Sequence, residues 1–489
     1  MTSASRAGPG ATGPACGQPP PCYGIRARGG QVVSSFRVSR VNNSSVFLEL
    51  IRAGRWDEAE RILRQMLRAD EHLDAFLDAV GQAYRRTEHV DRVMRALDIA
   101  LAVRPDSVRL HNALGAVHTR LDNDAEARAA FDRALRLAPD DPQTQVNIAR
   151  LHYRRRRYAE AEAAYRTALA SDAGFAPARY GLAECLLSRG ELREGFELYE
   201  SRWDAYPQLQ RIVDLPEPRP DAPPGRVAVY CEQGLGDLVQ FGRYVPALRQ
   251  RGWQVAARVD ANARPVMQRL GAATDGASLA ACDCGLSLCS LPRFFGTTLG
   301  SIPYAGVPYL AIPEIPPRAR DGLRVGLCWA GSPAHPNDAG RSVAARHFAR
   351  LARHDGVRLV SLQRGHTRRQ WPGRGKVDLD EGGAALAMER PALDDLGATL
   401  AVIGGLDLVV SVDTMVAHLA GAAGVPVWLV LPFSADWRWL SALPEYQQRS
   451  PWYPSMRLFR QPQPGDWEGV FEEVAAALTE LGGVRIPDR

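Results

Sequence analysis

Small and apolar residues in the first part of the chain recur with a period of 34 residues. Each unit carries a small residue, a large apolar residue and an alanine at fixed places, in the series Gly81, Gly115, Ala149 and Ala183; Leu97, Phe131, Tyr165 and Tyr199; and Ala100, Ala134 and Ala168. Small residues let two antiparallel helices approach closely, and the large residue fills the space between neighbouring pairs. Pro105 and Pro139 end two units, because proline cannot continue a helix. The pattern predicts a stack of helical hairpins.

The repeat divides this part of the chain into units whose first and last members are degenerate, as terminal repeats usually are: residues 40–73, 74–107, 108–141, 142–175 and 176–209. The array resembles the tetratricopeptide repeat. The resemblance implies a solenoid over residues 40–209 whose groove binds a protein or peptide segment. Ahead of it, the Gly-, Pro- and Ser-rich residues 1–39 predict a disordered tail.

The pattern changes after the repeats, where prolines mark a boundary and residues 210–225 form a predicted linker. Short β-branched runs then alternate with helical stretches, and the predicted strands are 226–231, 253–259, 285–288, 323–329, 357–362, 407–412 and 425–431. Such alternation predicts parallel sheets with crossover helices. The fold class is therefore α + α/β, an all-α solenoid followed by two Rossmann-like halves.

A second proline cluster separates the two predicted halves, residues 226–318 and 319–489. Open α/β sheets bind ligands at the carboxyl ends of their strands, so two such halves would face a common cleft. The last helix, about 467–481, follows a long crossing segment that would let it pack back on the first half.

The first strand of the first half runs into the sequence EQGLGD and then a helix. Gln233, Gly234 and Gly236 would form a cleft loop, because glycines let a ligand approach the backbone and a helix start offers free N–H groups. Asp237 either caps the helix or, at the mouth of a cleft, accepts a proton from an attacking hydroxyl. A dinucleotide site is a weaker alternative, because Val239 replaces the third glycine of that fingerprint.

In the second half, Asp413 and Thr414 follow a buried strand and open a helix, a natural place for a diphosphate. His418 lies one turn along the same face. The alternative is an ordinary capped helix with a histidine in the core.

A polar loop after another strand, residues 329–342, contains Ser332, Asn337 and Arg341. Arg341 is the best candidate for a phosphate, because a guanidinium pairs with phosphate through two hydrogen bonds. A solvated arginine is the alternative.

Taken together, residues 231–246, 290–303, 329–342, 411–421, 432–439 and 450–462 are similar to bacterial tetratricopeptide-repeat proteins whose C-terminal region resembles the heptosyltransferase-like glycosyltransferases of family 9. The layout is more distantly similar to the protein O-GlcNAc transferases. The resemblance implies a GT-B fold, with a nucleotide-sugar bound mainly by the C-terminal half and no metal. It implies Asp237 as the catalytic base and Asp413 and Thr414, with His418 nearby, as donor-phosphate ligands.

The chain departs from that pattern in the same loops. Pro336 stands where relatives usually carry a basic residue, Ala339 and Gly340 where they carry further polar residues, and Ala398 where an acid precedes Thr399. Losing a cation beside a diphosphate would weaken donor binding.

The composition of the chain limits the kinds of partner and the cellular locations that we expect. Lys and Arg number 60 against 55 Asp and Glu, a net charge of +5 that no stretch concentrates into a basic arm, so nucleic-acid partners are disfavoured. No apolar run is long enough to span a bilayer and no signal core is present, so we expect a cytoplasmic protein. Cys282, Cys284 and Cys289 lack a second ligand pair at zinc-finger spacing, and we expect neither a metal nor a cofactor.

The leading hypothesis is glycosyl transfer from a nucleotide-sugar to a hydroxyl of a protein or glycan acceptor that the repeats deliver. The alternative is a repeat scaffold whose transferase-like half has weak activity or none. A nicotinamide enzyme ranks third.

Overall fold

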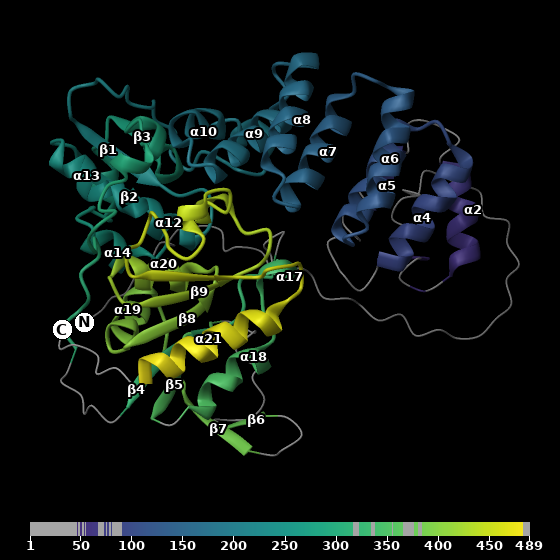
Figure 1. The fold of residues 1–489 in the computed structure, drawn as a ribbon. Helices are drawn as coiled ribbons and strands as arrows, with labels where there is room; N and C mark the ends of the chain where they lie inside the picture. The colour runs from purple at the N-terminus through teal and green to yellow at the C-terminus, as the bar shows by residue number, and fades with distance from the viewer. Residues whose placement is uncertain are drawn as a thin grey trace, which may run out of the picture.

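The computed structural model describes residues 90–315, 322–333, 338–354, 356–364, 376–379 and 384–482, together with residues 55–66 and isolated positions between 46 and 80. The predictions for the tail, Asn337 and Pro336 lie outside these residues. Within them, the chain forms a helical solenoid followed by two parallel sheets with helices on their faces (Figure 1).

The solenoid consists of α2 (Trp56–Met66), α4 (Val90–Val103) and three antiparallel helix pairs, α5 (Val108–Arg120) with α6 (Asp124–Leu137), α7 (Pro142–Arg154) with α8 (Tyr158–Ser171), and α9 (Ala176–Ser188) with α10 (Leu192–Tyr199). Glycines allow close packing of the helices: a Cβ on Gly115 would collide with the ring of Phe131, and one on Gly181 with the ring of Tyr165. The predicted helical hairpins are confirmed for the three pairs from Val108 to Tyr199.

After the short α11 (Arg202–Ala205), the first sheet has the strand order β2-β1-β3, and all its strands are parallel. Its elements in chain order are β1 (Arg226–Tyr230), α12 (Leu235–Gly242), α13 (Tyr244–Gln250), β2 (Gln254–Arg258), α14 (Arg264–Arg269), α15 (Gly276–Ala280), β3 (Cys284–Ser287) and α16 (Leu291–Phe294).

The second sheet has the order β10-β9-β8-β4-β5-β7-β6, parallel except at the β6–β7 pair. Its elements are β4 (Leu323–Cys328), α17 (Asp338–Arg341), α18 (Ala345–Ala349), β5 (Val357–Ser361), β6 (Lys376–Leu379), β7 (Ala384–Glu389), α19 (Leu396–Gly404), β8 (Leu408–Val412), α20 (Met415–Ala422), β9 (Val427–Leu431), β10 (Met456–Arg460) and α21 (Trp467–Gly482). Every predicted strand is present with bounds within two residues, whereas β6, β7 and β10 were not predicted.

The expectation that the last helix packs back on the first half is wrong. The apolar face of α21, with Phe471 and Val474, shares a core with Val325 and Val410 of the second sheet, and α21 also contacts α18.

One hydrophobic core runs from the end of the solenoid into both sheets. Leu187 and Phe196 of the last repeat belong to the same buried cluster as Val229 of β1 and Val409 of β8. Phe196 also packs edge-on against Trp437, with ring centroids 5.6 Å apart. The last repeat is therefore part of the α/β region's core, while α2 to α8 extend away from it (Figure 1).

Among the helices that the structure describes, none combines the length and the apolar character that spanning a bilayer demands.

Candidate functional site

Each sheet has a point where the strand order reverses. In the second sheet the chain passes from β4 to β5 on one side and reaches β8 on the other, so the reversal lies between β4 and β8. In the first sheet it lies between β1 and β3. Crevices outside the carboxyl ends of strands at such points are the usual ligand sites of open α/β sheets.

The loops that leave β4 and β8 contact each other at this point. Arg341 Nη1 donates to the backbone oxygen of Asp413 at 3.1 Å, and its Nε lies 3.5 Å from Asp338 Oδ1. Cys328 Sγ and Thr414 Oγ1 are 3.6 Å apart. The predicted donor residues Arg341, Asp413 and Thr414 thus lie together, whereas Ser332 of the same β4 loop is exposed.

The Asp413 carboxylate forms the centre of a buried polar cluster. Trp439 Nε1 donates to Asp413 Oδ2 at 2.8 Å, and His418 Nε2 lies 3.7 Å from Oδ1. The other ring nitrogen of His418 is 2.9 Å from the Tyr453 hydroxyl, and the imidazole stacks on Trp439. Burial alone would raise the pKa of Asp413, but His418, Trp439 and the Arg341 charge outweigh it and lower this pKa to about 2.

The start of α20 has no side-chain cap among the described residues. Thr414 holds the N-cap position, but its hydroxyl lies 3.2 Å from Ser411 Oγ instead of turning to the first amides of the helix. A helix start of this kind presents backbone N–H groups and the positive end of the helix dipole. Those groups suit an anion.

The start of α12 carries Asp237, which the sequence singled out as a cap or a base. Gly234 holds the N-cap position of α12, and Asp237, the third residue of the helix, accepts from the Gly234 N–H through Oδ2 at 3.0 Å, so Asp237 caps the helix from inside its first turn. Oδ1 forms an ion pair with Arg438, whose Nη1 also binds Asp436 at 2.7 Å and whose Nε donates to Gln240 at 2.8 Å. Each carboxylate oxygen keeps a second lone pair for another donor.

The two helix starts come from different sheets and touch. A Cβ added to Gly236 would lie 3.1 Å from His418 Cδ2 and 3.8 Å from the Met415 nitrogen. The glycine avoids this tight contact and so favours the close approach of α12 and α20. The structure brings the Gly236–Asp237 turn and the Asp413–His418 turn into one cluster.

The remaining residues of the β1 loop are anchored to the solenoid. Gln233 Nε2 donates to the Tyr199 hydroxyl at 3.0 Å, and the fully buried Arg202 Nε donates to Glu232 at 2.8 Å. Arg202 also pairs with Glu200 at 2.7 Å. The last helices of the solenoid thereby fix the loop that precedes Asp237.

Sequence reasoning missed several residues of this arrangement, among them Tyr199, Arg202, Arg438 and Trp439. The segment 432–439 belonged to the region of resemblance, so its two aromatic residues flanking an arginine were an available signal. Its partners were not predictable, because Arg438 and Asp237 are 201 positions apart in the chain.

The described residues contain no group of three or more His, Cys, Asp or Glu side chains that could hold a metal ion.

Comparison with known proteins identifies the solenoid. Two tetratricopeptide-repeat family models match residues 106–173 and 146–209. Residues 106–209 are tetratricopeptide repeats. This confirms the repeat resemblance, and such repeats support a role in binding protein partners.

A curated relative, protein FlbA of Caulobacter vibrioides, is 26% identical over 377 residues, which cover 64% of this chain. The match spans 56% of FlbA, little more than half of its length.

Two solved structures are similar over a third of the chain. The type IV pilus biogenesis factor PilW has 24% identity and a TM-score of 0.26, covering 33% of this chain and 76% of PilW. MamA has 16% identity and a TM-score of 0.24, covering 33% of this chain and 94% of MamA.

Proposed function

We propose that this chain is a metal-independent glycosyltransferase with a GT-B pair of domains. It would move a sugar from a nucleotide-sugar to a hydroxyl of a protein or glycan acceptor. The observation that carries the proposal is the contact of the two helix starts, which unites Asp237 of one sheet with the Asp413–Thr414 turn of the other.

Donor binding is assigned to the second sheet. The nucleoside diphosphate would lie at the uncapped start of α20, where backbone N–H groups and the helix dipole favour its charge. Arg341 is held beside that start by the Asp413 backbone oxygen and adds a guanidinium for the phosphates. The Trp439–Asp413–His418 cluster fixes the turn, so these groups are arranged before the donor arrives.

Acceptor activation is assigned to the first sheet. The acceptor hydroxyl attacks the anomeric carbon, the bond from that carbon to the diphosphate oxygen breaks, and the nucleoside diphosphate leaves with the bonding electrons. Asp237 takes the hydroxyl proton through a lone pair that neither Arg438 nor Gly234 uses. Arg438 keeps the carboxylate aimed across the cleft and serves as a positioning residue.

Calorimetric titration with a panel of nucleoside diphosphates tests donor binding. We expect one of them to bind wild type and to bind Arg341→Met on the order of tenfold more weakly, because a charge-assisted phosphate contact is lost. Arg136→Met is the control, since Arg136 is an exposed arginine of α6. Heat from none of the diphosphates would refute the proposal.

A scaffold without chemistry is the second candidate, favoured by the partners that both Asp237 oxygens already have. Cellular complementation separates the two. The scaffold predicts that Asp237→Asn restores the phenotype of a deletion strain as well as wild type does, and the transferase predicts that it fails.

A further inference from the structure

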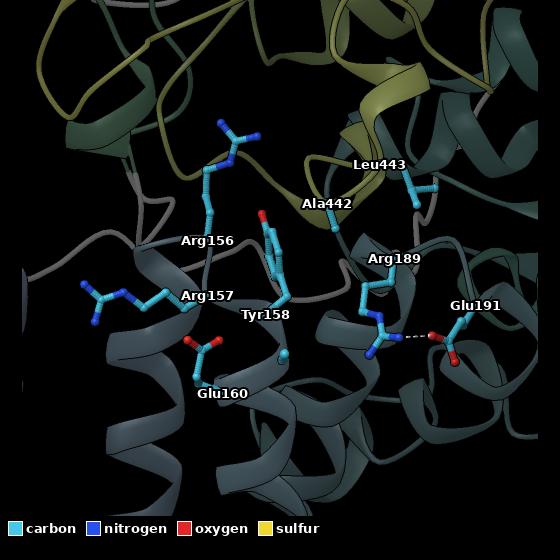
Figure 2. A pocket seen from close by; sticks show the side chains of 9 residues that line it. Arg156, Arg157, Tyr158, Glu160, Arg189, Glu191, Ala442 and Leu443 are labelled. Atoms are coloured by element: carbon cyan, nitrogen blue, oxygen red, sulfur yellow. Dashed lines mark ion pairs between the residues drawn. The ribbon is translucent and has the colours of Figure 1, made fainter.

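A groove lies between the edge of the solenoid and the segment that contains Ala442 and Leu443. It has a volume of about 610 Å³ and is lined by turns of two successive repeats and by that segment: Arg156, Arg157, Tyr158, Ala159, Glu160, Arg189, Glu191, Ala442 and Leu443. In Figure 2, Arg156 and Tyr158 extend toward the segment with Ala442 and Leu443, while Arg157 extends to the side. We call it the junction groove.

The charges of the junction groove are unbalanced. Arg189 is neutralised by Glu162 and by Glu191 at 3.1 Å. Within the described part of the chain, no carboxylate lies at ion-pair distance from Arg156 or Arg157. Glu191 of the lining pairs with Arg189, so Glu160 is the one described lining carboxylate left to oppose these two arginines.

A third guanidinium, that of Arg460, adds to the excess of positive charge near the groove. Arg460 is half-buried and donates to Ser441 Oγ at 2.8 Å and to the Gln447 backbone oxygen at 3.0 Å, while Arg156 donates to the Ser441 backbone oxygen at 2.8 Å. Both cations are held by neutral acceptors on one short segment. Burial, with the neighbouring charge of Arg156, lowers the pKa of Arg460 to about 10.

The groove also adjoins the candidate site. The segment that Arg156 and Arg460 hold at Ser441 continues back to Trp439, whose indole N–H donates to Asp413. A polymer anchored in the junction groove would therefore lie next to the segment that supports the candidate site.

We propose that the junction groove binds an acidic segment of a polypeptide. Acidic-peptide binding deepens the proposed function. It rests on that function only in taking the bound polypeptide to be the acceptor of the sugar. Spaced Asp or Glu side chains pair with Arg157 and with the field of Arg156, and backbone N–H groups of the peptide can face Glu160. A nucleic-acid backbone fits less well, because its continuous phosphates would meet the carboxylates of Glu160 and Glu191.

Fluorescence anisotropy with the full chain and a labelled peptide of alternating Glu and Ser tests the proposal. Arg157→Glu should weaken binding on the order of tenfold, because an exposed attractive charge becomes repulsive. Glu160→Gln should tighten it about twofold, since it removes the opposing charge. Arg136→Glu makes the same charge reversal on the solenoid outside the groove and should leave the affinity unchanged.

Three results would overturn the proposal. They are equal affinities of Arg157→Glu and Arg136→Glu, wild-type binding of an all-Ser peptide as tight as that of the Glu peptide, and tighter binding of an oligothymidylate than of the Glu peptide. The measurement needs no nucleotide-sugar. A chain that binds the peptide but no nucleoside diphosphate would therefore refute the transferase and keep the groove.

Discussion

The solenoid and its junction with the sheets use arginine in different ways. Between repeats, Arg133 pairs with Asp106 at 2.9 Å, with 42% and 73% of the two side chains exposed. At the junction, Arg202 pairs with Glu232 at 2.8 Å, with 0% and 1% exposed. Water screens the first pair, whereas the second must be satisfied by protein groups alone. The repeats are thus held together by local apolar packing, whereas the loop after β1 depends on buried charges from distant parts of the chain.

Removing one partner of the junction pair gives the largest expected effect. Glu232→Gln leaves the Arg202 charge buried with only Glu200 as its carboxylate partner, and we expect the free energy of unfolding to fall by about 4 kcal/mol. Chemical denaturation measures it. The double variant Arg202→Met with Glu232→Leu should lose less than the single one, because no charge stays buried. If Glu232→Gln lowered the free energy of unfolding by less than about 1 kcal/mol, the junction would tolerate the loss of a charged partner as well as the repeats do.

The second largest effect is expected from filling the gap between the starts of α12 and α20. Gly236→Val forces atoms into the space beside His418, and we expect a loss of about 2 to 3 kcal/mol in the free energy of unfolding. Gly276→Val is the matched control, since a Cβ there meets nothing within 4 Å. Equal losses in the two variants would mean that α12 and α20 do not pack as described.

The next prediction concerns how much stability the Asp413 cluster loses in acid. Because the pKa of Asp413 is about 2 in the folded chain, below the 3.8 of the free residue, its stabilisation is complete above about pH 5 and is lost as the pH falls through 2. The difference corresponds to about 2 kcal/mol. Unfolding of wild type and Asp413→Asn across pH 2 to 6 measures it, and the variant should lose less stability in acid. Parallel pH profiles would contradict the account.

The smallest effect is expected in the solenoid. Arg133→Ala removes an exposed ion pair, and we expect a change of less than about 0.5 kcal/mol in the free energy of unfolding. Thermal unfolding at low and high salt checks it. A loss comparable to that of Glu232→Gln would remove the distinction between the two regions.

The same distinction explains what the sequence could predict. Phe131, Tyr165 and Tyr199 recur every 34 residues and each is buried, so a fixed spacing reveals the packing between the helices. The strands were found because each buries a continuous apolar run. Neither signal depends on contacts between distant parts of the chain.

The candidate site was predictable only in part. Glycines and polar residues after buried strands pointed to the β1 and β8 turns, which the structure brings together. The role of Arg438 was not predictable, because a single arginine between two tryptophans has no periodicity and its partner lies on another sheet. The attachment of the β1 loop to Tyr199 and Arg202 joins a helical repeat to a sheet, and no local pattern encodes it.

Mass spectrometry of cellular proteins and surface polysaccharide tests the central claim most directly, in a deletion strain complemented with wild type or with Asp237→Asn. We expect a glycan present with wild type to be missing in the deletion strain and with Asp237→Asn, while Asp275→Asn, which alters a helix cap elsewhere in the first half, restores it. A glycan profile that Asp237→Asn restores in full would contradict the assignment of this cleft as a transferase site.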